Sequence, residues 1–349
     1  MPKLLTIALT TLTLTATPAT TTDRPTTPQH LLNQATTNGG VPGIVAHIRR
    51  PGHTWFGTAG VADLTTKNPR KPGEHFRIGS LTKAFTATIT LQLAAEHTLT
   101  LDDTVAHWLP GTVEQHTGAD GTAITIRQLL NHTSGLPDTN PGQPTPKPQQ
   151  PGKHFIYSKL NYTLAGMIIE KATGTTLTHQ ITHRITRPLK LTATHLPTTD
   201  PTIPDPHPKH YTKTGDTIHD ATTTDVSWAW AAGGMISTTD DLHRFLTALL
   251  RGRLLPPAQQ RDLLTTVPTG TDWIPNTRYG LGIFAQTLTC GRTVWGGGGA
   301  ITGSWTYAMA NRQATHTLVT NTNGDWNNPL TTFTALLENR YCPPAKKTP

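Results

Sequence analysis

The stretch Phe76-Arg77-Ile78-Gly79-Ser80-Leu81-Thr82-Lys83 decides how this chain is interpreted. It opens a segment, Ser80 to about His97, in which large apolar side chains return every four residues, at Leu81, Phe85, Ile89 and Leu93. That spacing is typical of a helix with one buried face. The sequence therefore predicts a long helix with Ser80 in its first turn.

Ser80 and Lys83 are three positions apart, which places both side chains on one face of that helix. A serine hydroxyl becomes a strong nucleophile when a base removes its proton, and lysine can be that base when burial or positive charge lowers its pKa. The pattern S-x-x-K is common, but this chain has few serines, so a chance match is improbable. The plainer alternative for Ser80 is a hydroxyl at a helix N-terminus.

Strand-like segments near both chain ends enclose a helical middle. Strands are predicted at 43–49, 54–62, 280–285, 293–295, 305–310 and 315–320, and helices at 29–38, 126–130, 162–172, 177–185, 239–250 and 330–338. The Pro-rich segments 137–153 and 200–210 are predicted to be exposed loops. This order predicts an α/β (α+β) fold. Its sheet is built from both chain ends, with residues 27–99 and 226–343 forming an α/β domain and 100–225 an inserted helical domain.

Composition and charge exclude several classes of function. The chain is 35% hydrophobic and 14% charged, with a formal net charge of +8. Its basic residues are scattered, without the aromatic interleaving of a nucleic-acid groove, so no nucleic-acid partner is predicted. A basic surface instead suits loose association with a polyanionic cell wall. No segment of 18 apolar residues follows the N-terminus, so no membrane span is predicted.

The N-terminus has the pattern of an export signal. Lys3 supplies positive charge, Leu4 to Leu14 is mostly apolar, and small residues follow at 16–19. We therefore expect residues 1–26 to be a signal peptide with a linker, residues 344–349 to be a tail, and the protein to be secreted as a monomer. An ordinary disordered N-terminus is the alternative.

Two cysteines, Cys290 and Cys342, are the only ones in the chain. In an exported protein such a pair predicts one disulfide. The 17 histidines lack metal-binding spacing, and those at 75, 132, 154, 207 and 210 are interpreted as solvated or capping residues. Neither a metal nor a cofactor is predicted.

The segment around Ser80 resembles the nucleophile motif of the serine beta-lactamase and penicillin-binding-protein family, which includes class C beta-lactamases, D-Ala-D-Ala carboxypeptidases and related esterases. The likeness continues in order through 99–103, 124–136, 157–162, 227–229 and 232–238. It is greatest to secreted actinomycete D-alanyl-D-alanine carboxypeptidases, whose two cysteines match in position. The resemblance implies an antiparallel sheet flanked by helices.

The resemblance also implies roles for individual residues. Tyr157 corresponds to a phenol that moves protons between Ser80, Lys83 and the leaving group, and a depressed pKa would suit that work. A packing residue with a hydrogen-bonded hydroxyl is the alternative for Tyr157. The backbone N–H groups of Ser80 and Ala300 correspond to an oxyanion hole. Trp228 corresponds to an aromatic residue that lines the cleft, with core packing as the alternative.

Two motifs depart from the family pattern. Lys159 replaces the asparagine of Tyr-x-Asn, and we hypothesise that its charge lowers the pKa of Lys83. Gly297, Gly298 and Gly299 stand where the family has Lys- or His-Thr-Gly, and four consecutive glycines are expected to weaken a strand and leave open space. These three glycines, Ala300, Lys159 and Trp228 are the predicted substrate-binding residues.

The groups that hold a substrate carboxylate in the carboxypeptidases are also replaced, by Phe284, Gly298 and Ala300. The sequence therefore predicts an active-site-serine hydrolase that works through an acyl-enzyme on a small or peptide acyl substrate, with doubtful recognition of a terminal carboxylate. An esterase or acyl-transferring relative is one alternative, and a catalytically degenerate binding protein on the same scaffold is another.

Overall fold

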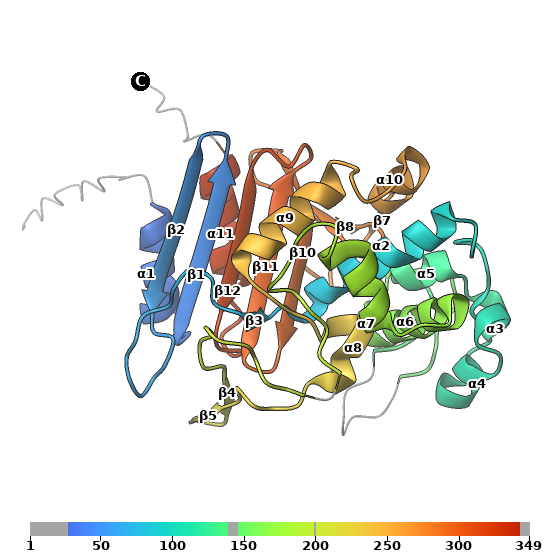
Figure 1. The fold of residues 1–349 in the computed structure, drawn as a ribbon, viewed down its shortest axis with the longest axis horizontal. Coiled ribbons are helices and arrows are strands. Elements are labelled where there is room, and N and C mark those ends of the chain that lie inside the picture. Colours follow the sequence, from blue (N-terminus) through green and yellow to red (C-terminus); the bar gives the residue numbers. More distant parts are fainter. Residues whose placement is uncertain (1–26, 139–145, 199, 343–349) are drawn as a thin grey trace, which may run out of the picture.

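The computed structural model describes residues 27–138, 146–198 and 200–342. An eight-stranded antiparallel sheet forms its centre, in the order β2-β1-β12-β11-β10-β9-β8-β7 (Figure 1). The predicted signal peptide and tail lie outside the described residues. The strands are β1 Gly43–Arg50, β2 His53–Gly60, β3 Phe76–Arg77, β4 Tyr211–Thr214, β5 Thr217–Asp220, β6 Ile236–Ser237, β7 Val267–Pro268, β8 Thr277–Tyr279, β9 Phe284–Thr287, β10 Thr293–Ile301, β11 Ser304–Asn311 and β12 Thr317–Thr322.

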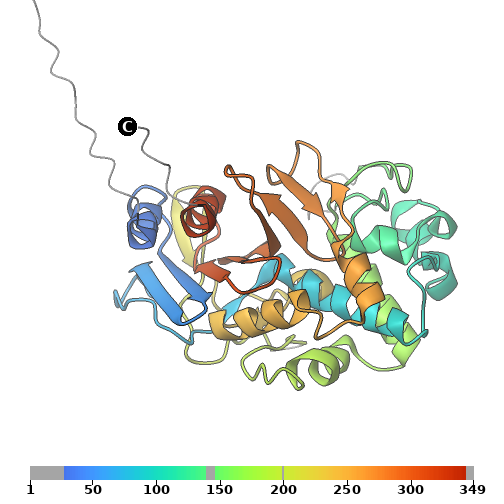
Figure 2. The same cartoon turned by 90° about the horizontal axis from the view of Figure 1, so that it is seen from above.

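Helices cover both faces of this sheet. Figure 2 shows α1 and α11 on one side and α2 and α9 on the other. The helices are α1 Pro28–Thr37, α2 Thr82–Ala95, α3 Val105–Trp108, α4 Thr112–Thr117, α5 Ile126–Leu130, α6 Lys159–Thr173, α7 Leu177–Ile181, α8 Trp230–Gly233, α9 Thr239–Leu250, α10 Pro257–Leu264 and α11 Leu330–Tyr341. Short 3₁₀ helices are η1 Gly79–Leu81, η2 Gly121–Ala123 and η4 Ser227–Ala229, and η3 Thr182–Thr186 is a short π-helix. The predicted fold class is confirmed, because strands from both chain ends form one sheet.

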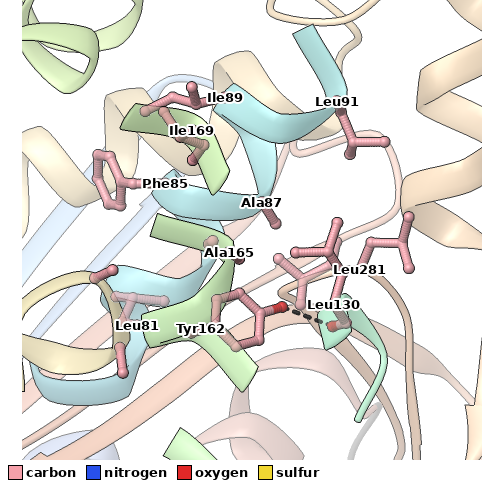
Figure 3. Packing of buried hydrophobic residues seen from close by; sticks show 14 of the residues in the cluster. Leu81, Phe85, Ala87, Ile89, Leu91, Leu130, Tyr162, Ala165, Ile169 and Leu281 are labelled. Carbon is pink, nitrogen blue, oxygen red and sulfur yellow. Dashed lines mark hydrogen bonds between the residues drawn. The ribbon is translucent and has the colours of Figure 1, made fainter. Parts of the chain in front are cut away.

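Helix α2 is the central helix of the larger hydrophobic core. Its side chains pack against α5, α6 and residue Leu281 (Figure 3), and the rings of Phe85 and Phe245 stack with centroids 3.7 Å apart. The prediction of a single buried face is wrong, because α2 is enclosed on nearly every side. Its threonines can be buried because their hydroxyls bond to backbone carbonyls, as Thr86 does with the carbonyl of Ala231 at 2.8 Å.

The structure corrects three further details. Ser80 lies in η1 rather than in the long helix, which begins at Thr82. The strand predicted over 293–295 is longer, because β10 continues through the glycine run to Ile301. Segment 200–210 is a loop, but Ile203 and His210 in it are buried, and the hairpin of β4 and β5 follows it.

Cys290 and Cys342 are joined in the structure as predicted, which ties the turn between β9 and β10 to the end of α11. Among the residues that the structure describes, no helix is both long enough and apolar enough to cross a membrane.

Candidate active site

Ser80 is held where η1 packs against the end of β10. Gly79 has a φ of +54°, a conformation that favours glycine. A Cβ on Gly79 would lie 3.0 Å from the nitrogen of Ala300, and a Cβ on Gly299 would lie 2.4 Å from the nitrogen of Ser80. The two backbones therefore touch, and glycine is required on both sides of the contact.

Ser80 and Lys83 meet as their spacing predicts. The Nζ of Lys83 donates to the Oγ of Ser80 at 3.0 Å and to the carbonyl of Ala232 at 2.6 Å. Lys83 is completely buried, whereas Ser80 is half-buried. The amine is thus fixed against a hydroxyl that remains open to a substrate.

Burial is the main reason why the pKa of Lys83 falls from its usual value to about 7. The carboxylate of Asp138 raises this pKa, and the charge of Lys159 lowers it to a smaller extent. A neutral amine is therefore accessible near neutral pH, and a neutral amine can accept a proton from Ser80.

Lys159 forms an ion pair with Asp138, which the sequence analysis did not single out. The Nζ of Lys159 lies 2.5 Å from Asp138, and the backbone N–H of Lys159 donates to the same carboxylate at 2.8 Å. The hypothesis that Lys159 lowers the pKa of Lys83 has the correct sign. It is incomplete, because burial dominates and Asp138 opposes the charge of Lys159.

Tyr157 lies beside the same amine. Its ring centroid is 4.9 Å from the Nζ of Lys83, a distance that suits a cation–π contact when the amine is protonated. Burial raises the pKa of Tyr157 well above its usual value, and hydrogen bonding with Ser80 offsets this only in part. The expectation of a depressed pKa is therefore wrong, and the phenol stays neutral as a donor.

The outer edge of β10 is open beside Ser80. Strand β9 pairs with β10 only from Thr293 to Gly296, whereas β11 accompanies β10 to Ile301. Alternate N–H groups along residues 297–301 therefore point from an edge that has no strand partner among the described residues. Ala300 lies on this edge, in contact with η1.

No cation is available at the positions that bind a carboxylate in the carboxypeptidases. Phe284 is buried, and Gly298 faces the ring of Tyr307. Arg77 lies three positions before Ser80, but its side chain is buried. Its guanidinium donates to the backbone carbonyls of Ala221, Thr222, Thr224 and Thr302. None of Phe284, Gly298 and Ala300 therefore supplies a charged side chain for a substrate carboxylate.

Trp228 is 61% exposed, which rules out the core-packing alternative. It belongs to η4, where its neighbour Ala229 packs on Ile301 at the end of β10. The aromatic ring is thus carried by a turn that touches the same strand end as η1.

His132 is the residue near the site that the sequence analysis misjudged most. It is fully buried rather than solvated, and its ring lies 4.4 Å from that of Tyr157. Its Nδ1 accepts from the N–H of Ser158 at 3.2 Å, and burial holds its pKa well below the usual range. The only signal in the sequence was its position inside a family motif.

No cluster of histidines with metal-ligand geometry occurs among the described residues. The one group of potential ligands there consists of Cys290, Glu338 and Cys342, and its two cysteines are joined to each other.

Comparison with known proteins gives one family model and several relatives. The model described as Beta-lactamase matches residues 29–338. Protein flp of Staphylococcus aureus (strain NCTC 8325 / PS 47) is 30% identical over 249 residues, which cover 65% of this chain and 48% of flp. The chain thus spans about half the length of the curated relatives it matches.

Two proteins of known structure match this chain over nearly its whole length. A D-stereospecific amidohydrolase from Streptomyces sp. is 39% identical, with a TM-score of 0.81, over 90% of this chain and 98% of its own. The D-amino acid amidase from Ochrobactrum anthropi SV3 is 26% identical, with a TM-score of 0.79, over 89% of this chain and 97% of its own.

Proposed function

The chain belongs to the Beta-lactamase family of serine hydrolases, and on that premise we propose that it hydrolyses amide bonds through an acyl-enzyme on Ser80. The observation that carries the proposal is the 3.0 Å contact between the Oγ of Ser80 and the Nζ of Lys83, whose pKa is lowered to about 7. A general base within hydrogen-bond reach of a serine is the signature of an activated nucleophile.

This geometry supports the following acylation step. Neutral Lys83 takes the proton of Ser80 as the oxygen attacks the substrate carbonyl, and the N–H groups of Ser80 and Ala300 stabilise the oxyanion. Tyr157, a neutral phenol, passes a proton to the leaving nitrogen and regains one through Lys83. The C–N bond then breaks, and water releases the acyl group from Ser80 by the same steps in reverse order.

For the substrate we propose amides of D-amino acids or short peptides that present no carboxylate beyond the scissile bond. Two observations support this choice. The Streptomyces relative is named a D-stereospecific amidohydrolase and the Ochrobactrum relative a D-amino acid amidase, and none of Phe284, Gly298 and Ala300 has a charged side chain for a terminal carboxylate. We place the substrate along Gly297–Ala300, with Lys159 and Trp228 at the borders of the cleft.

We also propose that the protein is exported and acts as a monomer. The apolar N-terminal segment and the pairing of Cys290 with Cys342 support export.

A catalytically inactive binding protein is the second candidate. The observation that favours it is the ion pair of Lys159 with Asp138, which replaces the neutral amide of the family motif. Such a protein would hold the substrate without forming a covalent adduct.

The deciding experiment measures the release of ammonia from D-phenylalanine amide and L-phenylalanine amide and of D-alanine from D-alanyl-D-alanine, together with labelling by a fluorophosphonate. We expect turnover of the D-amide above both other substrates, and labelling on Ser80. Ser80→Ala should lower kcat by at least about 10³-fold, because the nucleophile is lost.

Ser227→Ala is the matched control, since Ser227 is an exposed serine in the neighbouring turn η4. Full activity in Ser80→Ala would refute the assignment of the nucleophile. Absence of any adduct in a folded wild-type protein would favour the binding-protein alternative.

A further inference from the structure

An arginine-lined groove lies at the end of the sheet opposite Ser80. Its volume is about 490 Å³, and it contains Arg49 and Arg50 from the end of β1, with Arg244, Arg251 and Arg253 in and after α9. The paired strands β10 and β11 connect the two ends, and Ala300 is six positions after Val294. At 3.3 Å per residue this is about 20 Å, so the groove is separate from the active site.

The guanidinium groups of this groove are only partly neutralised. Arg49 pairs with Asp240, and Arg244 lies 3.5 Å from Asp241. Arg251 donates to the backbone carbonyls of Gln313 and Ala314, at 3.1 and 3.2 Å.

Arg50 and Arg253 are both exposed. Within the described residues, neither side chain forms an ion pair or a hydrogen bond. The groove therefore has excess positive charge and two guanidinium groups with all their donors available.

The base of the groove is neutral. His243 is buried there, with its Nδ1 2.6 Å from the Oγ1 of Thr317, which also lines the groove. Burial holds the pKa of His243 well below its usual range. The positive charge consequently comes from the arginines and persists at all pH values near neutrality.

Guanidinium groups recognise phosphate through paired N–H donors. A groove of this volume with five arginines along it suits several phosphates in a row rather than one. Apart from the buried ring of His243, the lining includes no aromatic side chain, so no exposed ring is present on which a nucleic-acid base could stack. The two exposed large apolar side chains of the described region, Ile218 and Trp228, lie in β5 and η4 rather than here, so the groove lacks an apolar anchor for a membrane.

We propose that this groove binds a linear phosphate-containing polyanion that lacks aromatic bases, and that it holds the protein on such a polymer while the active site remains free. The inference is independent of the proposed reaction, because it uses none of the residues around Ser80.

The test measures binding of long-chain inorganic polyphosphate to the full chain, by fluorescence anisotropy at 50 to 200 mM salt. The double variant Arg50→Gln/Arg253→Gln should bind at least about 10-fold more weakly than the wild type. The slope of log K against log salt should fall by about two, one for each lost phosphate contact. Amide hydrolysis by the variant should be unchanged.

Lys71→Gln/Lys171→Gln is the matched control, since it removes the same charge from exposed positions outside the groove. Its binding should stay within about threefold of the wild type. Equal losses in the two double variants would mean that only net charge matters, and would overturn the proposal.

Two further probes distinguish other occupants. Vesicles of anionic phospholipid that bind as tightly as polyphosphate, in an Arg50- and Arg253-dependent way, would assign the groove to a membrane and refute the proposal. Single-stranded DNA that binds more tightly than polyphosphate of equal charge would also refute it. Weak binding of both, and of inorganic phosphate alone, is the expected result.

Discussion

Lys83 shows how one buried side chain can acquire a chemical role from its surroundings. An exposed lysine keeps its proton at neutral pH, but burial penalises the charged form of Lys83 and lowers its pKa to about 7. The amine is then neutral above pH 7 and protonated below it. Since only the neutral form can take the proton of Ser80, we expect kcat/KM to rise with pH through about 7 and then level off.

The ion pair of Lys159 with Asp138 allows the role of Lys83 as the general base to be tested. Removing the positive charge and removing the negative charge should shift the pKa of Lys83 in opposite directions. Lys159→Asn removes a cation that lowers the pKa of Lys83, so the acid limb of the pH–rate profile should move to higher pH. Asp138→Asn removes a carboxylate that raises this pKa, so the limb should move to lower pH. Each displacement should be on the order of half a pH unit, because solvent screens half-exposed charges.

Profiles of kcat/KM against pH for the two variants and the wild type show whether the acid limb reports the pKa of Lys83. Lys147→Asn serves as a control, because it removes the charge of an exposed lysine. If both variants moved the acid limb in the same direction, or neither moved it, the limb would not report Lys83. A change in KM alone would indicate that the pair contacts substrate instead.

At the scale of elements, the contact of η1 with β10 fixes the distance between the nucleophile and the strand beside it. Gly299 allows this contact, because a Cβ there would lie 2.2 Å from the carbonyl oxygen of Ile78. Gly299→Ala should therefore push η1 from the strand. We expect it to cost about 1–3 kcal/mol of the free energy of unfolding and to lower kcat at least about 100-fold.

Gly297→Ala is the matched substitution on the same strand. Its Cβ would meet only the terminal Cδ1 of Leu81, at 2.7 Å, and a side-chain end can move. Its free energy of unfolding should stay within about 1 kcal/mol of the wild type, as measured by urea denaturation. Similar destabilisation by the two substitutions would contradict the importance of the backbone contact.

At the scale of the whole molecule, the disulfide closes a loop of 52 residues between the sheet and the last helix. In the chain-entropy model, a loop of this length stabilises the folded state by about 4 kcal/mol. Cys290→Ser/Cys342→Ser should lose about that amount in denaturant unfolding. Activity should persist, because the turn that holds Cys290 lies at the end of β10 away from Ser80.

Wild-type protein unfolded in the presence of a reductant is the control, and it should match the double variant. Equal stability of the oxidised wild type and the double variant would show that the two thiols are not paired in the protein.

The sequence by itself determined the features that depend on local spacing. The helix over Thr239–Leu250 and the closeness of Ser80 to Lys83 follow from helical periodicity, which any segment of this pattern obeys. The order of strands and helices was sufficient for the fold class. The resemblance to the serine beta-lactamase and penicillin-binding-protein family rested on motifs that occur in the same order along the chain.

Only the tertiary structure decided what depends on neighbours distant in sequence. Burial from several elements raises the pKa of Tyr157 and makes His132 a buried neutral residue. Asp138 reaches Lys159 across 21 positions, so no local pattern reveals the pair. The glycine run forms a strand because β11 pairs with it along its length. Desolvation and pairing are properties of the assembled fold, and a linear pattern carries neither.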